Sequence, residues 1–291
     1  MKEKLLKIFR SAVKPLLGKG VGKFYPVKLA YKFFTFFFNP ISVNGSKMYL
    51  DETDSLELLL NPNYEEMETE LFKKEIKLGD VILDIGANSG YYTLIAAKTV
   101  GEKGKVFAFE PDPNNFSLLS KNVRINNYNN VVLVKEAVSD KNGHCKLYLY
   151  EEDVHNKIND SSDKFSKRYD DKNKRKFIEI KTNRLDDYFK AYGGEINFIK
   201  MDIEGSEGLA IKGMTFLLKK NGTKKMIIEF YPHLIREYGL DPAESLDTLI
   251  KSKFKVYEVN NKTKEVNLIQ DNEVKEFCRN KRQTCLLCLK Q

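Results

Sequence analysis

The chain has 291 residues, of which 42% are hydrophobic and 31% are charged. Apolar runs recur along most of its length, so the composition excludes a collagen-like, low-complexity or wholly disordered chain and allows two small domains or one large α/β domain. The longest strongly apolar stretch, residues 33–38, is far shorter than the ~20 residues that a membrane-spanning helix needs. We therefore expect a globular protein that does not cross a bilayer.

The positive charge is concentrated at the N-terminus. Residues 1–39 contain nine lysine and arginine residues and one glutamate, and their formal charge of +8 equals that of the whole chain. Apolar residues recur between the cations at roughly helical spacing, and a phenylalanine-rich run follows. This pattern indicates either an interfacial anchor on anionic lipid or a helix whose apolar face packs on the protein body. Residues 1–45 are thus predicted to be a basic amphipathic extension, and residues 46–78 a cap or lead-in segment.

The four cysteines are too few for a disulfide scaffold in a chain of this length. No secretory h-region follows the basic N-terminus, so a reducing cytoplasm is the expected location. Cys285 and Cys288 have the spacing of a redox or zinc motif, but they lie in a run that is typical of a buried strand. Residues three apart on a strand point to opposite faces, which favours two core cysteines over a shared metal.

From Gly79 onward, short β-rich runs alternate with helical stretches, which is typical of a parallel α/β sheet. We predict one α/β domain over residues 79–291, interrupted at residues 151–176 by a charged segment with few apolar groups that is expected to form a mobile loop or lid. The predicted strands are 80–85, 105–110, 131–135, 196–201, 225–230, 254–259 and 283–289. The predicted helices are 90–100, 112–126, 185–191, 206–219 and 243–252, with a further helix from Tyr64 leading into the first strand.

The first strand ends at Asp84 and continues into Gly86, Ala87, Asn88 and Gly90. A tight glycine turn that leads straight into a helix lets a ligand approach the backbone closely. The turn lacks the glycine spacing of a dinucleotide fingerprint. The negative charge of Asp84 would repel a pyrophosphate, so this loop favours a cation that carries a nucleoside.

Acidic residues also end the later strands. Glu110, followed by Pro111 and Asp112, is placed to accept both hydroxyls of a ribose. The third strand ends near Glu136, where it could flank an adenine. The fourth is followed by Asp202, Glu204 and Glu207. Asp202 emerges directly from an apolar strand and is the better chemical candidate, whereas Glu204 and Glu207 also suit the start of a helix.

Together these motifs resemble the FkbM-type S-adenosylmethionine-dependent methyltransferases. The elements that carry the resemblance are Asp-Ile-Gly-Ala-Asn-Ser-Gly-Tyr-Tyr-Thr, Phe-Glu-Pro-Asp-Pro, Ala-Val-Ser-Asp-Lys-Asn-Gly, Ile-Lys-Met-Asp-Ile-Glu-Gly-Ser-Glu and Ile-Ile-Glu-Phe, in order over residues 64–232. The resemblance implies an α/β, Rossmann-like class I methyltransferase fold with a seven-stranded, mostly parallel sheet and an antiparallel last strand. It also implies O-methylation of a hydroxyl, often on a sugar or a polyketide.

The resemblance further implies which residues hold S-adenosylmethionine. The loop around the methionine part and the helix after it would supply Asp84, Gly86, Ala87, Asn88, Gly90, Tyr92 and Thr93. Glu110 would hold the ribose, and Pro111, Asp112, Glu136 and Ala137 would lie near the adenosine. Asp202 would border the same ligand. Whether Glu65 or Glu66 reaches the cofactor is left open.

Methyl transfer to oxygen is an in-line displacement, so catalysis should depend on alignment and on a base that removes the hydroxyl proton. Asp202 is the first candidate for that base, and His233 is the second because a neutral imidazole suits proton transfer near pH 7. No metal is required by this interpretation. As an alternative, Asp202, Glu204 and Glu229 could gather a Mg²⁺ that lowers the pKa of an acceptor hydroxyl.

The leading hypothesis is a cytoplasmic O-methyltransferase that acts on a sugar hydroxyl in a surface or lipid-linked glycan and docks at the inner membrane face through residues 1–39. One alternative substrate is RNA, because a basic arm can follow phosphates. With 41 lysines and 8 arginines, however, the chain lacks the arginine bias expected of base readout. A second alternative is a non-catalytic cofactor-binding adaptor. The oligomeric state is not predicted.

Overall fold

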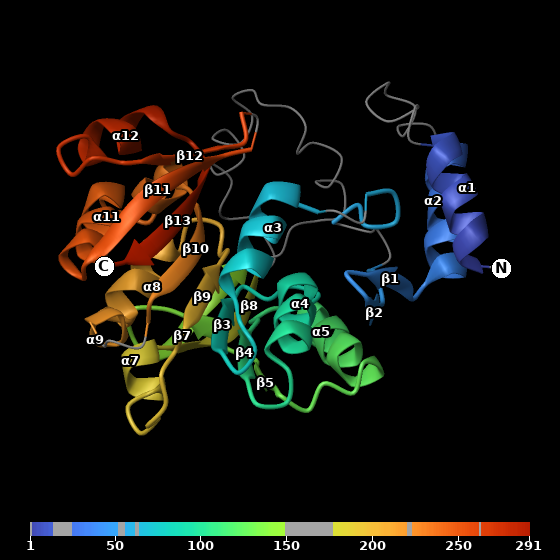
Figure 1. Cartoon of the computed structure of the whole chain (residues 1–291), viewed down its shortest axis with the longest axis horizontal. Coiled ribbons are helices and arrows are strands. Elements are labelled where there is room, and N and C mark those ends of the chain that lie inside the picture. Colours follow the sequence, from blue (N-terminus) through green and yellow to red (C-terminus); the bar gives the residue numbers. More distant parts are fainter. Residues whose placement is uncertain are drawn as a thin grey trace.

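The computed structural model describes residues 2–13, 25–51, 56–61, 64–148, 177–219, 223–261 and 263–291. The charged segment 151–176, which was predicted to be a mobile loop or lid, lies outside these described residues. The two chain ends lie at opposite sides of the molecule (Figure 1). None of the described helices combines the length and the apolar character that crossing a membrane requires.

A mixed sheet of eight strands forms the centre of the protein, in the spatial order β12-β11-β13-β10-β9-β3-β4-β5. Its strands are β3 (Val81–Ile85), β4 (Lys105–Phe109), β5 (Val131–Val134), β9 (Phe198–Met201), β10 (Lys225–Phe230), β11 (Phe254–Asn260), β12 (Glu265–Leu268) and β13 (Thr284–Lys290). The neighbours from β5 to β10 pair in parallel, whereas β13 is antiparallel to both β10 and β11. The predicted Rossmann-like sheet with an antiparallel last strand is confirmed, and β12 adds an edge strand that the sequence did not indicate.

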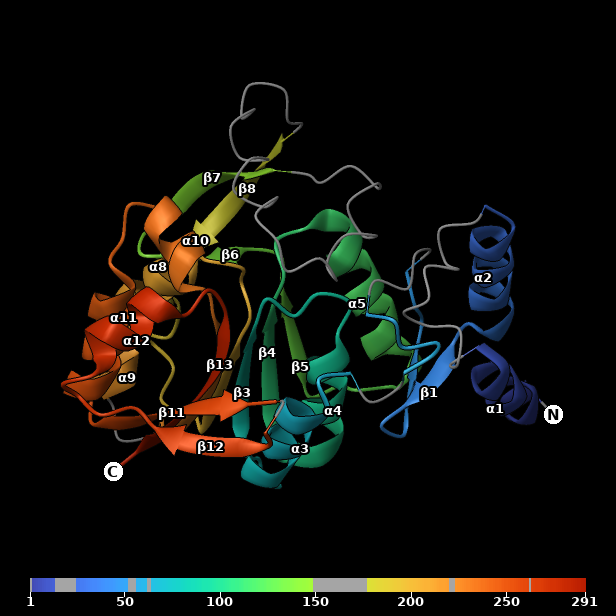
Figure 2. The same ribbon diagram turned by 90° about the horizontal axis from the view of Figure 1, so that it is seen from above.

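Helices cover both faces of this sheet, which is why its parallel strands are apolar on both sides. One face packs against α3 (Glu66–Glu75), α4 (Tyr91–Val100) and α5 (Pro113–Ile125). The other face packs against α7 (Leu185–Tyr188), α8 (Glu207–Gly213), α9 (Thr215–Lys219), α10 (Pro232–Glu237), α11 (Pro242–Lys251) and α12 (Val274–Asn280). Seen from above, these two groups of helices lie on opposite sides of the strands (Figure 2).

The two cysteines at redox or zinc spacing lie in β13 and are free and buried. Cys285 packs into the core on the α3–α5 side, whereas Cys288 packs into the core on the other side. The prediction of two core cysteines on opposite faces of a strand is therefore confirmed.

Two short helices, separated by a break at Met214, replace the single helix predicted over residues 206–219. The chain leaves α8 at Met214 and starts α9 at Thr215. At Gly213 the backbone lies so close to the preceding segment that a Cβ would meet the carbonyl oxygen of Ser139 at 2.0 Å. This contact is non-local, so the helical periodicity of the sequence could not reveal the break.

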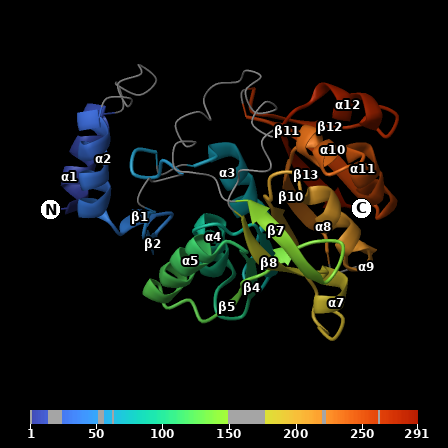
Figure 3. The same cartoon turned by 180° about the vertical axis from the view of Figure 1, so that it is seen from behind.

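A second sheet of three strands, in the order β6-β8-β7, lies beside α8 and was not predicted. It consists of β6 (Ala137–Val138), β7 (Gly143–Tyr148) and β8 (Phe177–Asn183). Seen from behind, β7 and β8 cross in front of the main sheet (Figure 3). All three strands of the second sheet come from the part of the chain between β5 and β9.

Near the N-terminus, α1 (Lys2–Val13) lies beside α2 (Tyr25–Phe38), and the ring centroids of Phe9 and Phe34 are 4.3 Å apart. A hairpin of β1 (Ile41–Val43) and β2 (Ser46–Met48) follows. The side chain of Asn122 on α5 holds this hairpin by hydrogen bonds to the backbone N–H and C=O of Tyr49. Because one buried cluster includes residues from α1, the hairpin and the main sheet, the divisions at residues 45 and 78 remain proposals.

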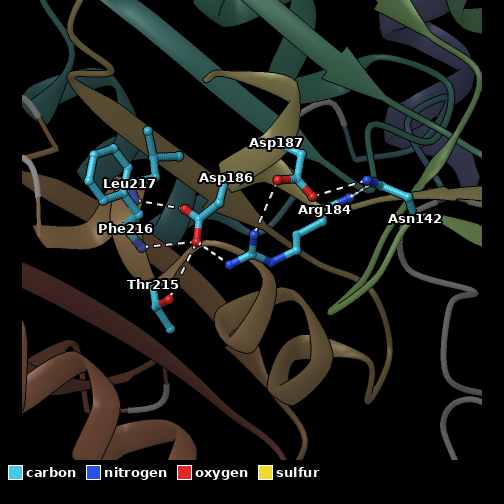
Figure 4. A network of polar contacts seen from close by, with 7 residues as sticks. All are labelled: Asn142, Arg184, Asp186, Asp187, Thr215, Phe216 and Leu217. Atoms are coloured by element: carbon cyan, nitrogen blue, oxygen red, sulfur yellow. Dashed lines mark hydrogen bonds and ion pairs between the residues drawn. The ribbon is translucent and has the colours of Figure 1, made fainter. Parts of the chain in front are cut away.

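A polar network connects α7 to the start of α9 (Figure 4). The buried carboxylate of Asp186 accepts hydrogen bonds from the backbone N–H groups of Phe216 and Leu217, at 3.0 and 2.8 Å, and from the guanidinium of Arg184 at 2.9 Å. The neighbouring Asp187 pairs with Arg184 and Asn142 on the more exposed side. Asp186 thereby satisfies donors that the first turn of a helix leaves without intrahelical partners.

We expect Asp186→Ala to lower the free energy of unfolding by about 1–3 kcal/mol, because it removes the acceptor of the buried N–H group of Leu217. The matched variant Asp187→Ala removes a half-exposed carboxylate one residue away and should cost no more than about 0.5 kcal/mol. Urea unfolding of the two variants measures the difference. Equal losses of stability would contradict the capping role of Asp186.

Candidate active site

The candidate site lies where neighbouring parallel strands end on the α3–α5 face of the sheet. Asp84 on β3 is in register with Lys200 on β9, and Lys200 is in register with Ile227 on β10. Side chains two residues apart on a strand share a face, so Asp202 follows Lys200 and Glu229 follows Ile227 on this side. The parallel register therefore gathers charged groups from three strands at one edge.

The loop after β3 is held in a conformation that brings its backbone against the end of β9. Gly86 and Asn88 have φ values of +83° and +49°, in the left-handed region that favours glycine and asparagine. A Cβ on Gly86 would lie 1.9 Å from the carbonyl oxygen of Asp202. Only glycine allows the loop to pass this close, and the contact fixes the distance between the two strand ends.

Asp84 is buried and receives a hydrogen bond of 2.5 Å from the hydroxyl of Thr93 in the first turn of α4. Burial raises the pKa of Asp84 to about 6, against the lowering effects of the Thr93 hydrogen bond and of Lys200. The Asp84 carboxylate thus remains the ionised form near neutral pH while lying next to the loop.

Glu110 follows β4 and is also buried. Its two carboxylate oxygens accept hydrogen bonds from the backbone N–H groups of Asn88, at 2.8 Å, and Asp112, at 2.9 Å. Burial raises its pKa to about 7 despite these two bonds. Each oxygen keeps a second lone pair, so the carboxylate can still accept hydrogen bonds from a ligand. Asp112 itself caps α5 by accepting from the N–H groups of Asn114 and Asn115.

A cluster of three carboxyl groups lies beside the loop, formed by Glu65, Asp202 and Glu229. One oxygen of each lies within 4.8 Å of the others. Tyr92 donates a hydrogen bond of 2.8 Å to Glu65, and Tyr231 donates one of 2.6 Å to Glu229. We call these three residues the acid cluster.

Asp202 and Glu229 in the acid cluster differ in how readily they hold a proton. Burial, the charge of Asp202 and then that of Glu65 raise the pKa of Glu229 well above its usual range. The pKa of Asp202 is raised by burial, while the charge of Lys200 and a hydrogen bond from Glu229 lower it. Glu229 therefore holds a proton in preference to Asp202, so Asp202 rather than Glu229 is available to accept one.

Lys200 supplies the positive charge next to these carboxylates. Its side chain is 1% exposed, and Nζ has no hydrogen-bond partner within the parts of the chain that the structure describes. The ammonium lies 4.7 Å from the centroid of the Tyr92 ring. Although burial lowers the pKa of Lys200, the charges of Asp202, Glu229 and Glu65 outweigh that effect and raise it, so the amine stays protonated.

A pocket opens at this point of the described structure, and its lining includes six of the predicted cofactor residues, Asp84, Gly86, Ala87, Asn88, Tyr92 and Asp202. Gly90 is the N-cap of α4, and Thr93 acts through Asp84. Glu110 is joined to the pocket through Asn88, and Pro111 and Asp112 follow it toward α5.

Four predicted residues lie apart from this pocket. Glu136 is bound by Lys181 at 2.5 Å and Asn183 at 2.6 Å, which ties it to the second sheet, where Ala137 also lies. His233 is in the first turn of α10, with Nδ1 2.6 Å from the carbonyl oxygen of Arg282. Glu204 is exposed and is not in the acid cluster, so the carboxylate trio predicted for Mg²⁺ is corrected to one in which Glu65 takes its place.

Sequence reasoning missed Lys200, Tyr64 and Tyr91, which line the pocket, and left Glu65 undecided. A signal for Lys200 was present in the apolar run Phe-Ile-Lys-Met. A central strand of a parallel sheet is covered on both faces, so a lysine within it is buried and its ammonium needs a partner. No local signal identified Glu65. It precedes α3 with a φ of 44°, and only the packing of that helix on the sheet brings it to Asp202.

The arrangement combines a negative potential, a close backbone approach and a proton acceptor. Ionised carboxylates favour a cationic ligand. The loop from Gly86 to Asn88 allows a ligand to contact the backbone, and Asp202 beside it can take a proton from a hydroxyl. This is the set of properties that transfer of an alkyl group from a cationic donor to an oxygen requires.

Comparison with known proteins gives this geometry a family. The model of the methyltransferase FkbM domain matches residues 84–269. Hexuronic acid methyltransferase AglP of Haloferax volcanii is 26% identical over 189 residues, which are 63% of this chain and 66% of that protein. A protein of Sulfurisphaera tokodaii named "Probable cobalt-precorrin-6B C(15)-methyltransferase (decarboxylating)" is 42% identical over 65 residues, 22% of this chain and 34% of that protein. The alignment with the latter thus spans about a third of that relative's length.

Among solved structures, the methyltransferase FkbM from Methylobacillus flagellatus is 16% identical, with a TM-score of 0.41 over 80% of this chain and 54% of that chain. The family model includes Asp84, Glu110, Asp202 and Glu229 and extends over well more than half of the chain. The chain therefore belongs to the methyltransferase FkbM family.

Proposed function

We propose that this protein transfers a methyl group from S-adenosylmethionine to a hydroxyl of a sugar, in a surface or lipid-linked glycan. The observation that carries the proposal is the position of Asp202, which lines the same pocket as Asp84, Gly86 and Asn88. A proton acceptor thus borders the loop that is suited to a cationic nucleoside. The family match supports the choice of donor.

The residues present fit S-adenosylmethionine. Glu110 offers free lone pairs for two ribose hydroxyls, and Asp84 and the acid cluster offer negative charge for a sulfonium. When bound, this donor supplies a methyl group on a positively charged sulfur. The chain aligns the acceptor, excludes water and accepts the hydroxyl proton at the Asp202 carboxylate. His233 remains the second candidate for the base.

The sugar acceptor is supported by one relative. The Haloferax volcanii relative is named a hexuronic acid methyltransferase. Its name supports a sugar acid as the acceptor of the protein described here. RNA is the alternative substrate, and a non-catalytic adaptor is the alternative function. The Asp202 carboxyl group in the lining of the pocket favours catalysis over the adaptor.

The first test is transfer of labelled methyl from S-adenosylmethionine into lipid-linked glycan, free polysaccharide, RNA and protein fractions of the source cell. We expect label in a glycan fraction. Asp202→Asn should lower the turnover rate by about 10²–10⁴-fold, the usual contribution of a general base, which is a larger effect than the accompanying loss of affinity for the cationic S-adenosylmethionine. His233→Gln measures the second candidate in the same assay.

The matched control for Asp202→Asn is Glu237→Gln, which removes an exposed carboxylate on α10 and should retain full turnover. Label in the RNA fraction would replace the sugar by RNA as acceptor. No label in any fraction would favour the adaptor. Wild-type turnover in Asp202→Asn would show that Asp202 is not the base.

Affinity for S-adenosylmethionine should depend on pH through Glu110. Its pKa of about 7 lies above the usual value of 4.5, so the carboxyl gains a proton as the pH falls through 7 and then accepts fewer hydrogen bonds from ribose hydroxyls. Titration calorimetry should show tighter binding at pH 8 than at pH 6. Glu110→Gln should weaken binding at pH 8 by roughly 10–100-fold, the equivalent of losing hydrogen bonds to a charged group.

In Glu110→Gln the remaining pH dependence should be centred near pH 6, where Asp84 titrates. Glu195→Gln, which removes an exposed carboxylate just before β9, is the matched control and should bind like the wild type. An unchanged pH dependence in Glu110→Gln would rule out a role for Glu110 in holding the ribose.

We propose in addition that α1 and α2 dock the enzyme on an anionic membrane. The structure divides the apolar residues of this helix pair into two sets. Leu6 and Phe38 are buried in the core cluster, whereas Leu5, Ile8, Phe33, Phe36 and Phe37 are exposed, with Phe36 82% exposed. The buried set packs on the protein body, and the exposed set supports the proposal of a membrane contact.

The positive charge on α1 and α2 indicates what the exposed apolar side chains bind. The exposed Lys4, Lys7 and Lys32 lie on the same two helices, and lysines beside exposed phenylalanines complement the anionic headgroups and acyl boundary of a bilayer. A single-sided apolar surface with a basic surround is typical of helices that lie in the membrane interface. We infer that the active protein sits at the inner membrane face, near lipid-linked acceptors.

The membrane proposal predicts that replacing Phe33, Phe36 and Phe37 together by serine lowers partitioning to vesicles containing phosphatidylglycerol by at least roughly tenfold, because burying an apolar side chain contributes about 1.5–3 kcal/mol. These substitutions leave the buried set intact, unlike deletion of the helices. Leu78→Ser with Phe216→Ser removes exposed apolar side chains elsewhere and serves as the control. Co-sedimentation that is equal in all three proteins would refute the membrane contact.

A further inference from the structure

Lys200 is a charged residue in a position where strands of this fold are apolar. It occupies the third position of β9, between Ile199 and Met201, and all four residues of the strand are buried. Burying an ammonium ion is costly unless it is paired and hydrogen-bonded. Its Nζ nevertheless has no hydrogen-bond partner within the described residues. The position of this lysine therefore calls for an explanation beyond packing.

The surroundings of Lys200 supply charge compensation but leave its N–H groups open. The negative charge of the acid cluster, which Asp202 carries in preference to Glu229, acts on the ammonium, and Asp84 lies beside it in register on β3. The Tyr92 ring covers one side at 4.7 Å. The same lysine lines the pocket together with Asp202. A donor with unfilled hydrogen bonds and a proton acceptor thus face one cavity.

We propose that Lys200 is a catalytic residue, whose ammonium donates a hydrogen bond to the acceptor oxygen while Asp202 removes the proton from that oxygen. This inference rests on the proposed O-methyl transfer and adds a second group to it. The acceptor hydroxyl would fill the N–H capacity of Lys200 that the protein leaves open. The positive charge stabilises the negative charge that develops on the oxygen, as preorganised donors do at other reacting oxygens.

The chemical step balances with the groups named. The hydroxyl proton passes to the carboxylate of Asp202, and the acceptor oxygen forms the new O–CH₃ bond. The S–CH₃ bond breaks with its electron pair left on sulfur, which neutralises the sulfonium. Lys200 keeps its proton throughout, so it acts as a hydrogen-bond donor and as a charge.

Lys200 also bears on the alternative of a divalent metal ion. The acid cluster has the ligand type and the spacing that suit Mg²⁺. A fixed ammonium beside the same carboxylates already supplies positive charge at the pocket. With Lys200 in place, the cluster does not need a second cation to activate the acceptor, and turnover should not depend on Mg²⁺.

The experiment compares Lys200→Ala and Lys200→Met with the wild type in the methyl-transfer assay. Loss of a preorganised donor at a reacting oxygen usually lowers turnover by 10²–10³-fold, and we expect a loss of about that size in both variants, with affinity for S-adenosylmethionine within roughly threefold of wild type. Ethylammonium or propylammonium added to Lys200→Ala should restore part of the turnover, whereas propanol should not. Wild-type turnover should be unchanged in excess EDTA.

The matched control is Lys225→Ala on the adjacent strand β10, which removes a lysine paired with Glu75 at 2.6 Å and away from the pocket. It should retain wild-type turnover. Calorimetric binding of S-adenosylmethionine verifies that each variant is folded, and Lys200→Met, which keeps the volume of the side-chain stem, is the second variant in case Lys200→Ala unfolds.

Several results would overturn the inference. Wild-type turnover in a folded Lys200 variant would do so, as would a loss explained entirely by weaker S-adenosylmethionine binding. Loss of wild-type activity in EDTA with recovery in Mg²⁺ would assign the activating charge to a metal. If the wild type labels no fraction at all, the proposed function fails and the role of Lys200 fails with it, whereas a labelled acceptor with an unaffected variant contradicts Lys200 alone.

Discussion

The structure depends most on how one buried positive charge is accommodated at the end of a parallel sheet. Lys200 lies between β3 and β10, with carboxyl groups near it just after β9, on β10 and at the start of α3. Neither the ammonium nor these carboxylates could be buried alone at tolerable cost. Because their opposite charges compensate each other, these groups can be buried together at the edge of the sheet. The same charges leave Asp202 rather than Glu229 as the group able to take a proton.

A second constraint is the close contact between two strand ends. The carbonyl of Asp202 lies against Gly86, and the backbone N–H of Asp202 donates to the carbonyl of Ile85 at 2.9 Å. Two residues beside the pocket, Glu65 and Asn88, have positive φ although they are not glycine. Such conformations persist only where the surrounding structure holds them. The loop that would carry the donor and the residue that would take the proton are thus parts of one rigid unit.

The N-terminal helices connect the candidate active site with the proposed membrane contact. Their buried residues join the core on the same side of the sheet as α3. Arg10 donates a hydrogen bond to the carbonyl of Leu59, and Leu56, which lies earlier in the same segment, lines the pocket. A membrane on the exposed side of this pair would therefore be connected through a short segment of chain to the candidate active site.

The sequence by itself determined seven of the eight strands of the main sheet and the residues at the ends of several of them, because apolar runs and glycine turns are local patterns. Asp84, Glu110 and Asp202 were found this way, and so was the burial of Cys285 and Cys288 on opposite faces. Only the tertiary structure decided which carboxylates meet. It placed Glu65 rather than Glu204 with Asp202 and Glu229, tied Glu136 to Lys181 and divided the helix at Met214. Each of these outcomes depends on contacts between segments far apart in the chain, and no local periodicity encodes how such segments pack.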